Sequence, residues 1–123
     1  MKLFTMIFGA AISIGVVSAS VSAQTEPSYK ADPDVYKVIF EDANFRVIEG
    51  NRKTGVRDKM HSHPVPSIVY NLTDCRSKQY FPDGKTTEQA VKAGTVTAIP
   101  IITSHSAENI SSTDCKQIFI EKK

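Results

Sequence analysis

Short runs of β-forming residues, separated by turns that contain glycine or proline, make up the chain from residue 35 onward. Val38–Phe40, Phe45–Glu49 and Ile118–Ile120 are examples of such runs. No stretch keeps the 3.6-residue apolar period long enough to predict a stable helix, although residues 88–92 are compatible with a single helical turn. About eight short strands within roughly 85 residues predict an all-β sandwich or barrel.

Proline and glycine also indicate where the strands begin and end. The tripeptide Pro82-Asp83-Gly84 is a strong hairpin signal. Pro64 and Pro66 lack a backbone N–H and therefore predict a bend or a sheet edge. The strands predicted on either side of Pro64 and Pro66 are Lys59–His63 and Ser67–Leu72. Two further strands, Val96–Ile102 and His105–Ile110, are predicted after Gly94.

Residues 1–23 have the pattern of a secretory signal peptide. Lys2 supplies the positive charge, Leu3–Val17 is apolar, and Val21-Ser22-Ala23 is a small-residue cleavage site. A membrane anchor is the alternative, but the apolar stretch is short and interrupted by glycine, serine and threonine. We therefore expect export to a bacterial periplasm or secretion. Residues 24–34 are predicted to be a loose N-terminal arm, and residues 35–123 a single domain.

The charge balance excludes some classes of partner. Removing Lys2 from the formal net charge of +2 leaves +1 for a mature chain of about 100 residues. Such a balance predicts neither nucleic-acid nor membrane binding. Arg52, Lys53 and Arg57 are interpreted as a small solvated basic cluster.

Two cysteines occur in similar local contexts, Thr73-Asp74-Cys75 and Thr113-Asp114-Cys115. Export implies an oxidising compartment, in which Cys75 and Cys115 could form a disulfide. Two unpaired thiols with diverging side chains remain the alternative.

All three histidines of the chain belong to two spaced motifs. His61 and His63 are two residues apart, so on a strand their imidazoles point to the same face. His105, from another strand, could complete a set of nitrogen ligands for a divalent transition metal. The alternative is a group of inward histidines that hydrogen-bond one another without a metal. Burying three imidazoles without a shared partner is costly, which favours the metal.

The two motifs resemble those of small single-domain cupins of the type 2 class. Gly55, His61 and His63 match the first motif, whose glutamate falls on Ser67 and whose last glycine falls on Asp74. The second motif is matched by Gly94, Pro100, His105 and Asn109, with Ile102 in place of its inner glycine. The resemblance covers most of residues 35–122 and implies a double-stranded β-helix, or jelly-roll barrel.

The resemblance also implies a site. His61, His63 and His105 would point into the barrel and hold Fe, Mn, Ni, Cu or Zn. Ser67 and Asn71 share strand parity and would line the ligand pocket.

A site of three neutral histidines is similar to that of thiol dioxygenases, which are distant cupin relatives. The first hypothesis is a non-haem metal-dependent dioxygenase or other oxidoreductase acting on a small organic substrate. The second is a non-catalytic module that binds or senses a small ligand or a metal. No catalytic residue beyond the ligands can be assigned, because the sequence offers no further histidine and no identifiable cavity carboxylate. Cupins often pair through exposed β-edges, so the resemblance also implies a homodimer.

Overall fold

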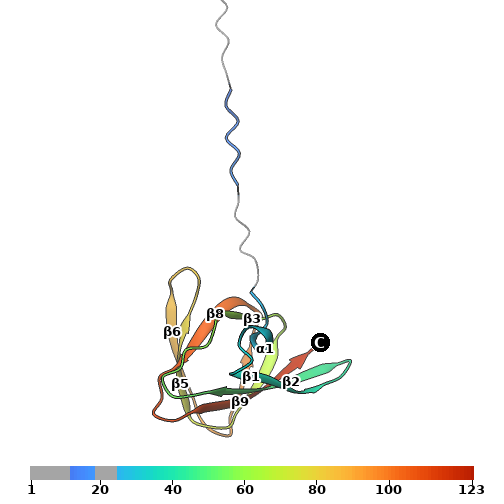
Figure 1. Cartoon of the computed structure of the whole chain (residues 1–123), viewed down its shortest axis with the longest axis vertical. Coiled ribbons are helices and arrows are strands. Elements are labelled where there is room, and N and C mark those ends of the chain that lie inside the picture. Colours follow the sequence, from blue (N-terminus) through green and yellow to red (C-terminus); the bar gives the residue numbers. More distant parts are fainter. Residues whose placement is uncertain (1–11, 19–24) are drawn as a thin grey trace, which may run out of the picture.

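Nine strands and one short helix form the domain in a computed structural model that describes residues 12–18 and 25–123. In chain order they are α1 (Ser28–Ala31), β1 (Tyr36–Glu41), β2 (Phe45–Arg52), β3 (His61–His63), β4 (Ser67–Asn71), β5 (Cys75–Tyr80), β6 (Thr86–Val91), β7 (Val96–Ile99), β8 (Ile102–Asn109) and β9 (Cys115–Lys122). One sheet has the order β1-β2-β9-β4-β7 and the other β3-β8-β5-β6. The two antiparallel sheets face each other around a common interior, which confirms the all-β prediction (Figure 1).

Several predicted boundaries need correction. The predicted strand Val96–Ile102 ends at Ile99, and Ile102 begins β8 instead. Pro100 lies between them and, without an N–H, cannot continue the ladder between β7 and β4. Residues 88–92 form no helical turn, because residues 86–91 pair with β5 in full register. The predicted hairpin at residues 82–84 is confirmed, and Gly84 has a φ of 85° that favours glycine.

The segment before β1 is not a loose arm. Ser62 donates its backbone N–H to the Glu26 carbonyl and its hydroxyl to the Thr25 carbonyl. Asp32 then accepts the N–H of Lys59. Residues 25–34 are therefore fastened to the strand that carries two of the histidines.

The predicted signal peptide lies mostly outside the described residues. Residues 12–18 of that segment have no regular secondary structure, and their side chains are exposed. Within residues 12–18 and 25–123, no helix is both long and apolar enough to cross a bilayer.

The apolar core lies on the inner face of the larger sheet and directly under the histidine strand. It consists of Val35, Tyr36, Ile48, Val69 and Phe119, with Tyr29 and Ile99 packed against it. Position 50 of β2 lies on this face and is a glycine, because a side chain would have no room there. An added Cβ there would lie 2.8 Å from the ring of Phe119 and 3.3 Å from that of Tyr36.

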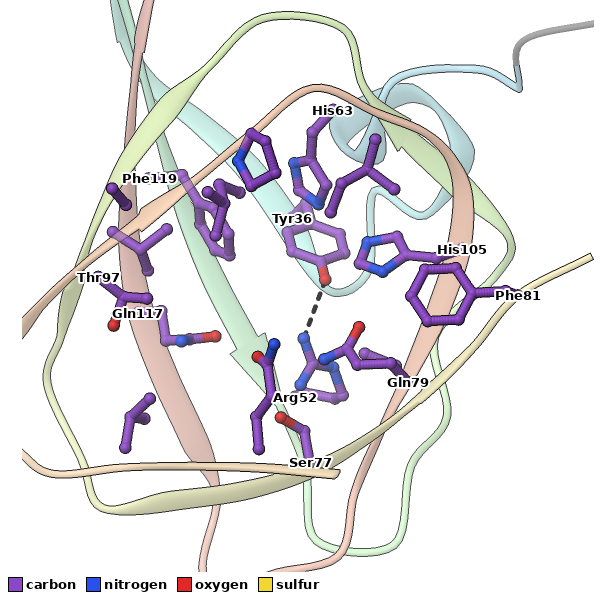
Figure 2. A pocket seen from close by; sticks show the side chains of 18 residues that line it. Tyr36, Arg52, His63, Ser77, Gln79, Phe81, Thr97, His105, Gln117 and Phe119 are labelled. Carbon is purple, nitrogen blue, oxygen red and sulfur yellow. Dashed lines mark hydrogen bonds between the residues drawn. The ribbon is translucent and has the colours of Figure 1, made fainter. Parts of the chain in front are cut away.

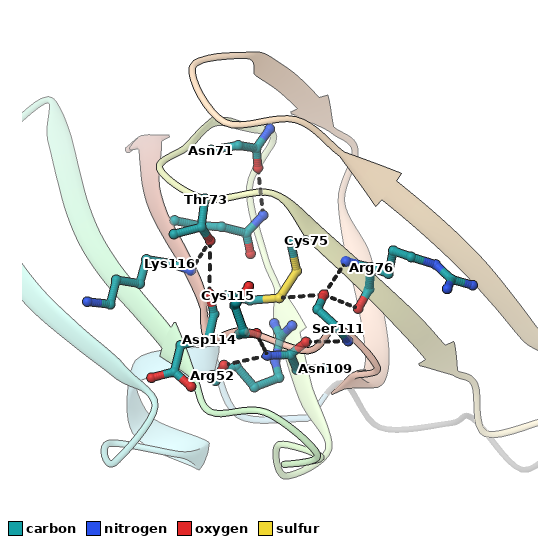
Figure 3. Close-up of a disulfide and its surroundings, with 12 residues drawn as sticks. Arg52, Asn71, Thr73, Cys75, Arg76, Asn109, Ser111, Asp114, Cys115 and Lys116 are labelled. Atoms are coloured by element: carbon teal, nitrogen blue, oxygen red, sulfur yellow. Dashed lines mark hydrogen bonds between the residues drawn. A yellow bond between two sulfur atoms is a disulfide. The ribbon is translucent and has the colours of Figure 1, made fainter.

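A disulfide joins the two sheets at one end of the domain. Cys75 of β5 and Cys115 of β9 are bonded, with their Cα atoms 5.3 Å apart, which confirms the predicted bridge (Figure 3). Beside it, the Asn109 amide donates to the carbonyls of Arg52 and Thr113 and so ties β8 to β2. The bridge is consistent with an oxidising, exported compartment.

Reducing this disulfide should lower the free energy of unfolding by about 4 kcal/mol, because it releases a 40-residue loop in the unfolded chain. Urea denaturation with and without a reductant measures the difference. The double variant Cys75→Ser/Cys115→Ser should be insensitive to the reductant. Two titratable thiols in the unreduced, denatured protein would contradict the bridge.

Candidate metal centre

The three predicted ligands come together on the smaller sheet. His61 and His105 are directly opposite each other in the antiparallel pair of β3 and β8. His63, two residues along β3, presents its imidazole to the same side. One ring nitrogen of each histidine lies within 4.8 Å of the others, and all three residues are buried.

Hydrogen bonds fix which nitrogen of His61 is free. The Nδ1–H of His61 donates to the Lys59 carbonyl at 2.8 Å, and a carbonyl can only accept. Nε2 of His61 is therefore unprotonated in the neutral ring and carries a lone pair toward the cluster. It lies 3.2 Å from Nε2 of His63. His63 Nδ1 and both ring nitrogens of His105 are buried and have no hydrogen-bond partner within the described part of the chain.

The surroundings of the cluster keep the imidazoles neutral. Burial, followed by the proximity of the other imidazoles, lowers the pKa of His63 to about 3. Burial, followed by the proximity of the His61 imidazole and of the Arg52 guanidinium, lowers the pKa of His105 to about 3 as well. Burial also lowers the pKa of His61, although the nearby carboxylate of Asp58 works in the opposite direction. Neutral imidazole is the form that binds a metal.

A buried polar network lies behind the cluster. Arg52 donates through Nε to Asp58 at 3.1 Å and through Nη2 to the Tyr36 hydroxyl at 3.0 Å, and that hydroxyl donates to Asp58 at 2.7 Å. The other oxygen of Asp58 accepts the backbone N–H of Ala107 and lies 3.7 Å from Nδ1 of His61. The Tyr36 ring in turn packs against the His61 ring at 5.1 Å. This network positions His61 from its far side.

A cavity of about 360 Å³ lies between the two sheets and reaches His63 and His105 (Figure 2). The two histidines occupy one end of this cavity, whereas Arg52, Ser77 and Gln79 lie toward the other. Gln117 and Phe119 of β9 form part of the remaining wall. The Phe119 ring is stacked on that of His63, with 5.7 Å between centroids, and limits how far that imidazole can move.

Sequence comparisons give no match: no family model and no curated protein matches this chain. Solved structures do match it. A cupin domain from Bordetella pertussis Tohama I superposes with a TM-score of 0.66 at 21% identity over 72% of this chain and 92% of that one. A double-stranded β-helix protein from Klebsiella pneumoniae superposes with a TM-score of 0.55 at 16% identity, over 85% and 90% of the two chains. The protein has the fold of a small cupin domain. At these identities the likeness establishes the fold alone.

The three-histidine site fits a transition metal by its own geometry. Two imidazole nitrogens bound about 2.1 Å from one metal are separated by about 3.0 to 3.4 Å at coordination angles between octahedral and tetrahedral. The 3.2 Å between the Nε2 atoms of His61 and His63 falls in this range. A shared metal would also give His105 the partner that it lacks. A metal with three neutral ligands would keep its full charge and have coordination positions to spare.

Ser67 and Asn71 share strand parity with Val69, as predicted, and both are buried. Neither belongs to the cavity lining, which differs from the prediction that they would line the ligand pocket. The Ser67 hydroxyl donates to the Val65 carbonyl, and the Asn71 carboxamide bonds Thr95, Thr97 and Gln117. Asn71 therefore acts on the cavity indirectly, because it holds Gln117 in its wall.

Arg52 is a cavity-lining residue that the sequence interpretation placed wrongly. It is 5% exposed and lines the cavity, whereas it was predicted to be part of a solvated basic cluster. The signal was its parity: Ile48, Gly50 and Arg52 alternate on β2, and the first two are buried. Gln79 and Gln117 gave no comparable signal, because an isolated glutamine on a strand predicts no site.

A glutamate at position 67, where the cupin motif has one, should destabilise this chain and should not restore a ligand. Ser67 is paired directly with Glu121, which is 1% exposed and whose pKa is raised by burial. Ser67→Glu would add a second buried carboxylate there, and we expect a loss of about 2 to 3 kcal/mol at pH 7. Urea denaturation against the uncharged control Ser67→Gln measures the effect of charge. Equal stability of the two variants would contradict this placement.

Proposed function

We propose that this cupin binds one divalent transition metal through His61, His63 and His105 and acts on a small organic molecule held in the adjoining cavity. The observation that carries the proposal is the convergence of three buried, neutral imidazoles, two of which, those of His63 and His105, line one end of the cavity between the sheets. Fe, Mn, Ni, Cu and Zn all suit imidazole ligands, with Mn the least favoured in the absence of a carboxylate.

The activity that fits this arrangement best is a non-haem metal-dependent oxidation, for which a bound metal would supply the activation of O₂. The residues of the chain would hold the metal, orient the substrate and exclude water. Phe81 and Phe119 are aromatic neighbours of His105 and His63, and Ile99 and Ile102 line the cavity near them. Such an apolar lining around the ligands favours chemistry that water would interrupt.

A non-catalytic binding or sensing role is the second candidate, and one observation favours it. In the described part of the chain, no aspartate or glutamate lines the cavity, and its histidines belong to the ligand set. A general acid or base is therefore not supplied by a carboxylate or by a further imidazole.

Anaerobic reconstitution followed by measurement of O₂ consumption separates the two roles. The mature domain is loaded separately with Fe(II), Mn(II) and Cu(II), and small organic acids, thiols and phenols are added in turn. Substrate-dependent O₂ uptake that disappears in His63→Ala supports an oxygenase. Metal binding without O₂ uptake for any metal and substrate pair supports the binding role.

We further propose that the protein works in the periplasm or outside the cell, which the sequence of residues 1–23 and the Cys75–Cys115 bridge both support. Fractionation of cells that express the full chain tests this location. A full-length, uncleaved chain in the cytosol with free thiols would contradict it.

A further inference from the structure

Arg52 has an unusual position for an arginine, because it is almost fully buried and yet lines the cavity. Its Nε and one N–H of Nη2 are used by Asp58 and Tyr36. Nη1 makes no hydrogen bond to the described part of the chain, and it is not among the enclosed polar atoms that lack a partner. The free edge of the guanidinium therefore faces the cavity and offers the two-pronged donor geometry that matches a carboxylate.

The charge of the cavity points the same way. Among the lining side chains that the structure describes, Arg52 is the one with a formal charge, and aspartate and glutamate are absent. Its partner Asp58 lies outside the lining, so this buried ion pair presents its positive end to the cavity. A divalent metal on three neutral histidines would add two further positive charges. An anionic ligand would be attracted to such a wall, and a cationic ligand would be repelled.

Gln79 provides a second indication of what the cavity binds, and this one does not depend on charge. Gln79 is 9% exposed, and its Oε1 is enclosed without any hydrogen-bond donor among the described residues. In Figure 2 its carboxamide lies between Arg52 and His105. Nε2 of the same carboxamide is neither enclosed nor hydrogen-bonded among the described residues, so a half-turn of the carboxamide would exchange the two atoms and present Oε1 to the cavity. A ligand O–H or N–H group could then donate to this otherwise unpaired acceptor.

We propose that the cavity binds a small carboxylate that also carries a hydrogen-bond donor, with the carboxylate on Arg52 and the donor on Gln79. In this pose the rest of the molecule faces the histidine end of the cavity. That last step rests on the proposed metal function, whereas the contacts with Arg52 and Gln79 do not. The ligand class is thus a short hydroxy, amino or mercapto acid, within the limit of about 360 Å³.

Titration calorimetry with a matched set of probes tests the proposal on the mature, disulfide-bonded domain, both metal-free and loaded with Zn²⁺. The probes are 3-hydroxypropionate, propionate, 3-hydroxypropionamide and inorganic phosphate. We expect 3-hydroxypropionate to bind at least tenfold more tightly than the neutral amide, and more tightly than propionate and phosphate. An amide or phosphate that binds as tightly as 3-hydroxypropionate would overturn the proposal.

Two variants of Gln79 locate the site without disturbing the buried Arg52–Asp58 pair. Gln79→Glu places a negative charge in the cavity and should weaken both carboxylates at least tenfold. Gln79→Met removes the acceptor, so that 3-hydroxypropionate and propionate should bind equally. Unchanged binding in Gln79→Glu, or an unchanged preference for the hydroxyl in Gln79→Met, would overturn the assignment.

Arg52→Lys keeps the positive charge beside Asp58 but removes the two parallel N–H donors of the guanidinium. The affinity for carboxylates should therefore fall at least fivefold. Arg76→Lys is its control, because Arg76 is exposed and lies outside this cavity. If Arg52→Lys does not fold, the Gln79 variants decide.

Metal titrations on the same samples distinguish the ligand proposal from the metal proposal. Metal binding without carboxylate preference overturns only the ligand proposal, and carboxylate preference without metal binding overturns only the metal proposal.

Discussion

Replacing His63 or His105 with alanine should lower the affinity of the domain for Zn²⁺ or Ni²⁺ by about 100-fold or more, since even residues that merely support metal ligands contribute 10- to 100-fold. These two positions are preferred to His61, whose Nδ1 also holds the Lys59 carbonyl and whose loss would disturb β3. Competition against a chelating dye measures the affinity.

Ser62→Ala is the matched control for these variants. Ser62 lies between the two histidines on β3 and is 1% exposed, but its hydroxyl donates to the Thr25 carbonyl on the other side of the strand. Its removal should therefore leave the metal affinity within about twofold of the wild type. Equal affinity in His63→Ala and Ser62→Ala would contradict the assignment of His63 as a ligand.

The metal-free domain should lose stability steeply on acidification. His63 and His105 have a pKa near 3 in the folded state, against about 6.5 in the unfolded chain. Below pH 6.5 the unfolded chain takes up protons that the folded domain does not, so stability is fully present above 6.5 and is lost as the pH falls toward 3. With two such groups, the free energy of unfolding should fall by up to about 2.7 kcal/mol per pH unit. The total loss between pH 7.5 and pH 4.5 should be about 5 kcal/mol.

Urea denaturation at a series of pH values measures this slope. The metal-loaded domain should start higher at pH 7.5, because a metal that binds only the folded state adds stability by mass action. It should then converge on the metal-free curve as protons displace the metal. His63→Ala/His105→Ala should flatten the metal-free curve between pH 6.5 and pH 4.5. A wild-type curve as flat as that of the double variant would show that the two imidazoles are not buried and neutral.

The sequence was sufficient for the fold class and for the convergence of the three histidines, because both depend on short-range patterns. Alternation and turn residues predict strands, and a two-residue spacing on a strand places His61 and His63 on one face. For the two cysteines the sequence left two alternatives, a disulfide or two free thiols. In the structure Cys75 begins β5 and Cys115 begins β9, and the bond between them joins the two sheets.

The cavity could not be predicted, because its walls come from both sheets and depend on register. Ser67 has the expected parity but is paired with Glu121, and only the β4–β9 register reveals this neighbour. Arg52 is buried because it meets Asp58 and Tyr36, which are separated from it by 6 and 16 residues. A charged residue at an inward position of a strand is a signal for such a network, but the partners emerge only from tertiary structure.

Elemental analysis of the mature domain after loading tests the metal centre most directly. The domain is incubated separately with Fe, Mn, Ni, Cu and Zn, freed of unbound ions, and its metal content is compared with that of His63→Ala/His105→Ala prepared in the same way. The three converging histidines predict close to one metal per chain for at least one of these ions, and close to none in the double variant. No bound metal with any of the five, or the same content in both proteins, would contradict the metal centre.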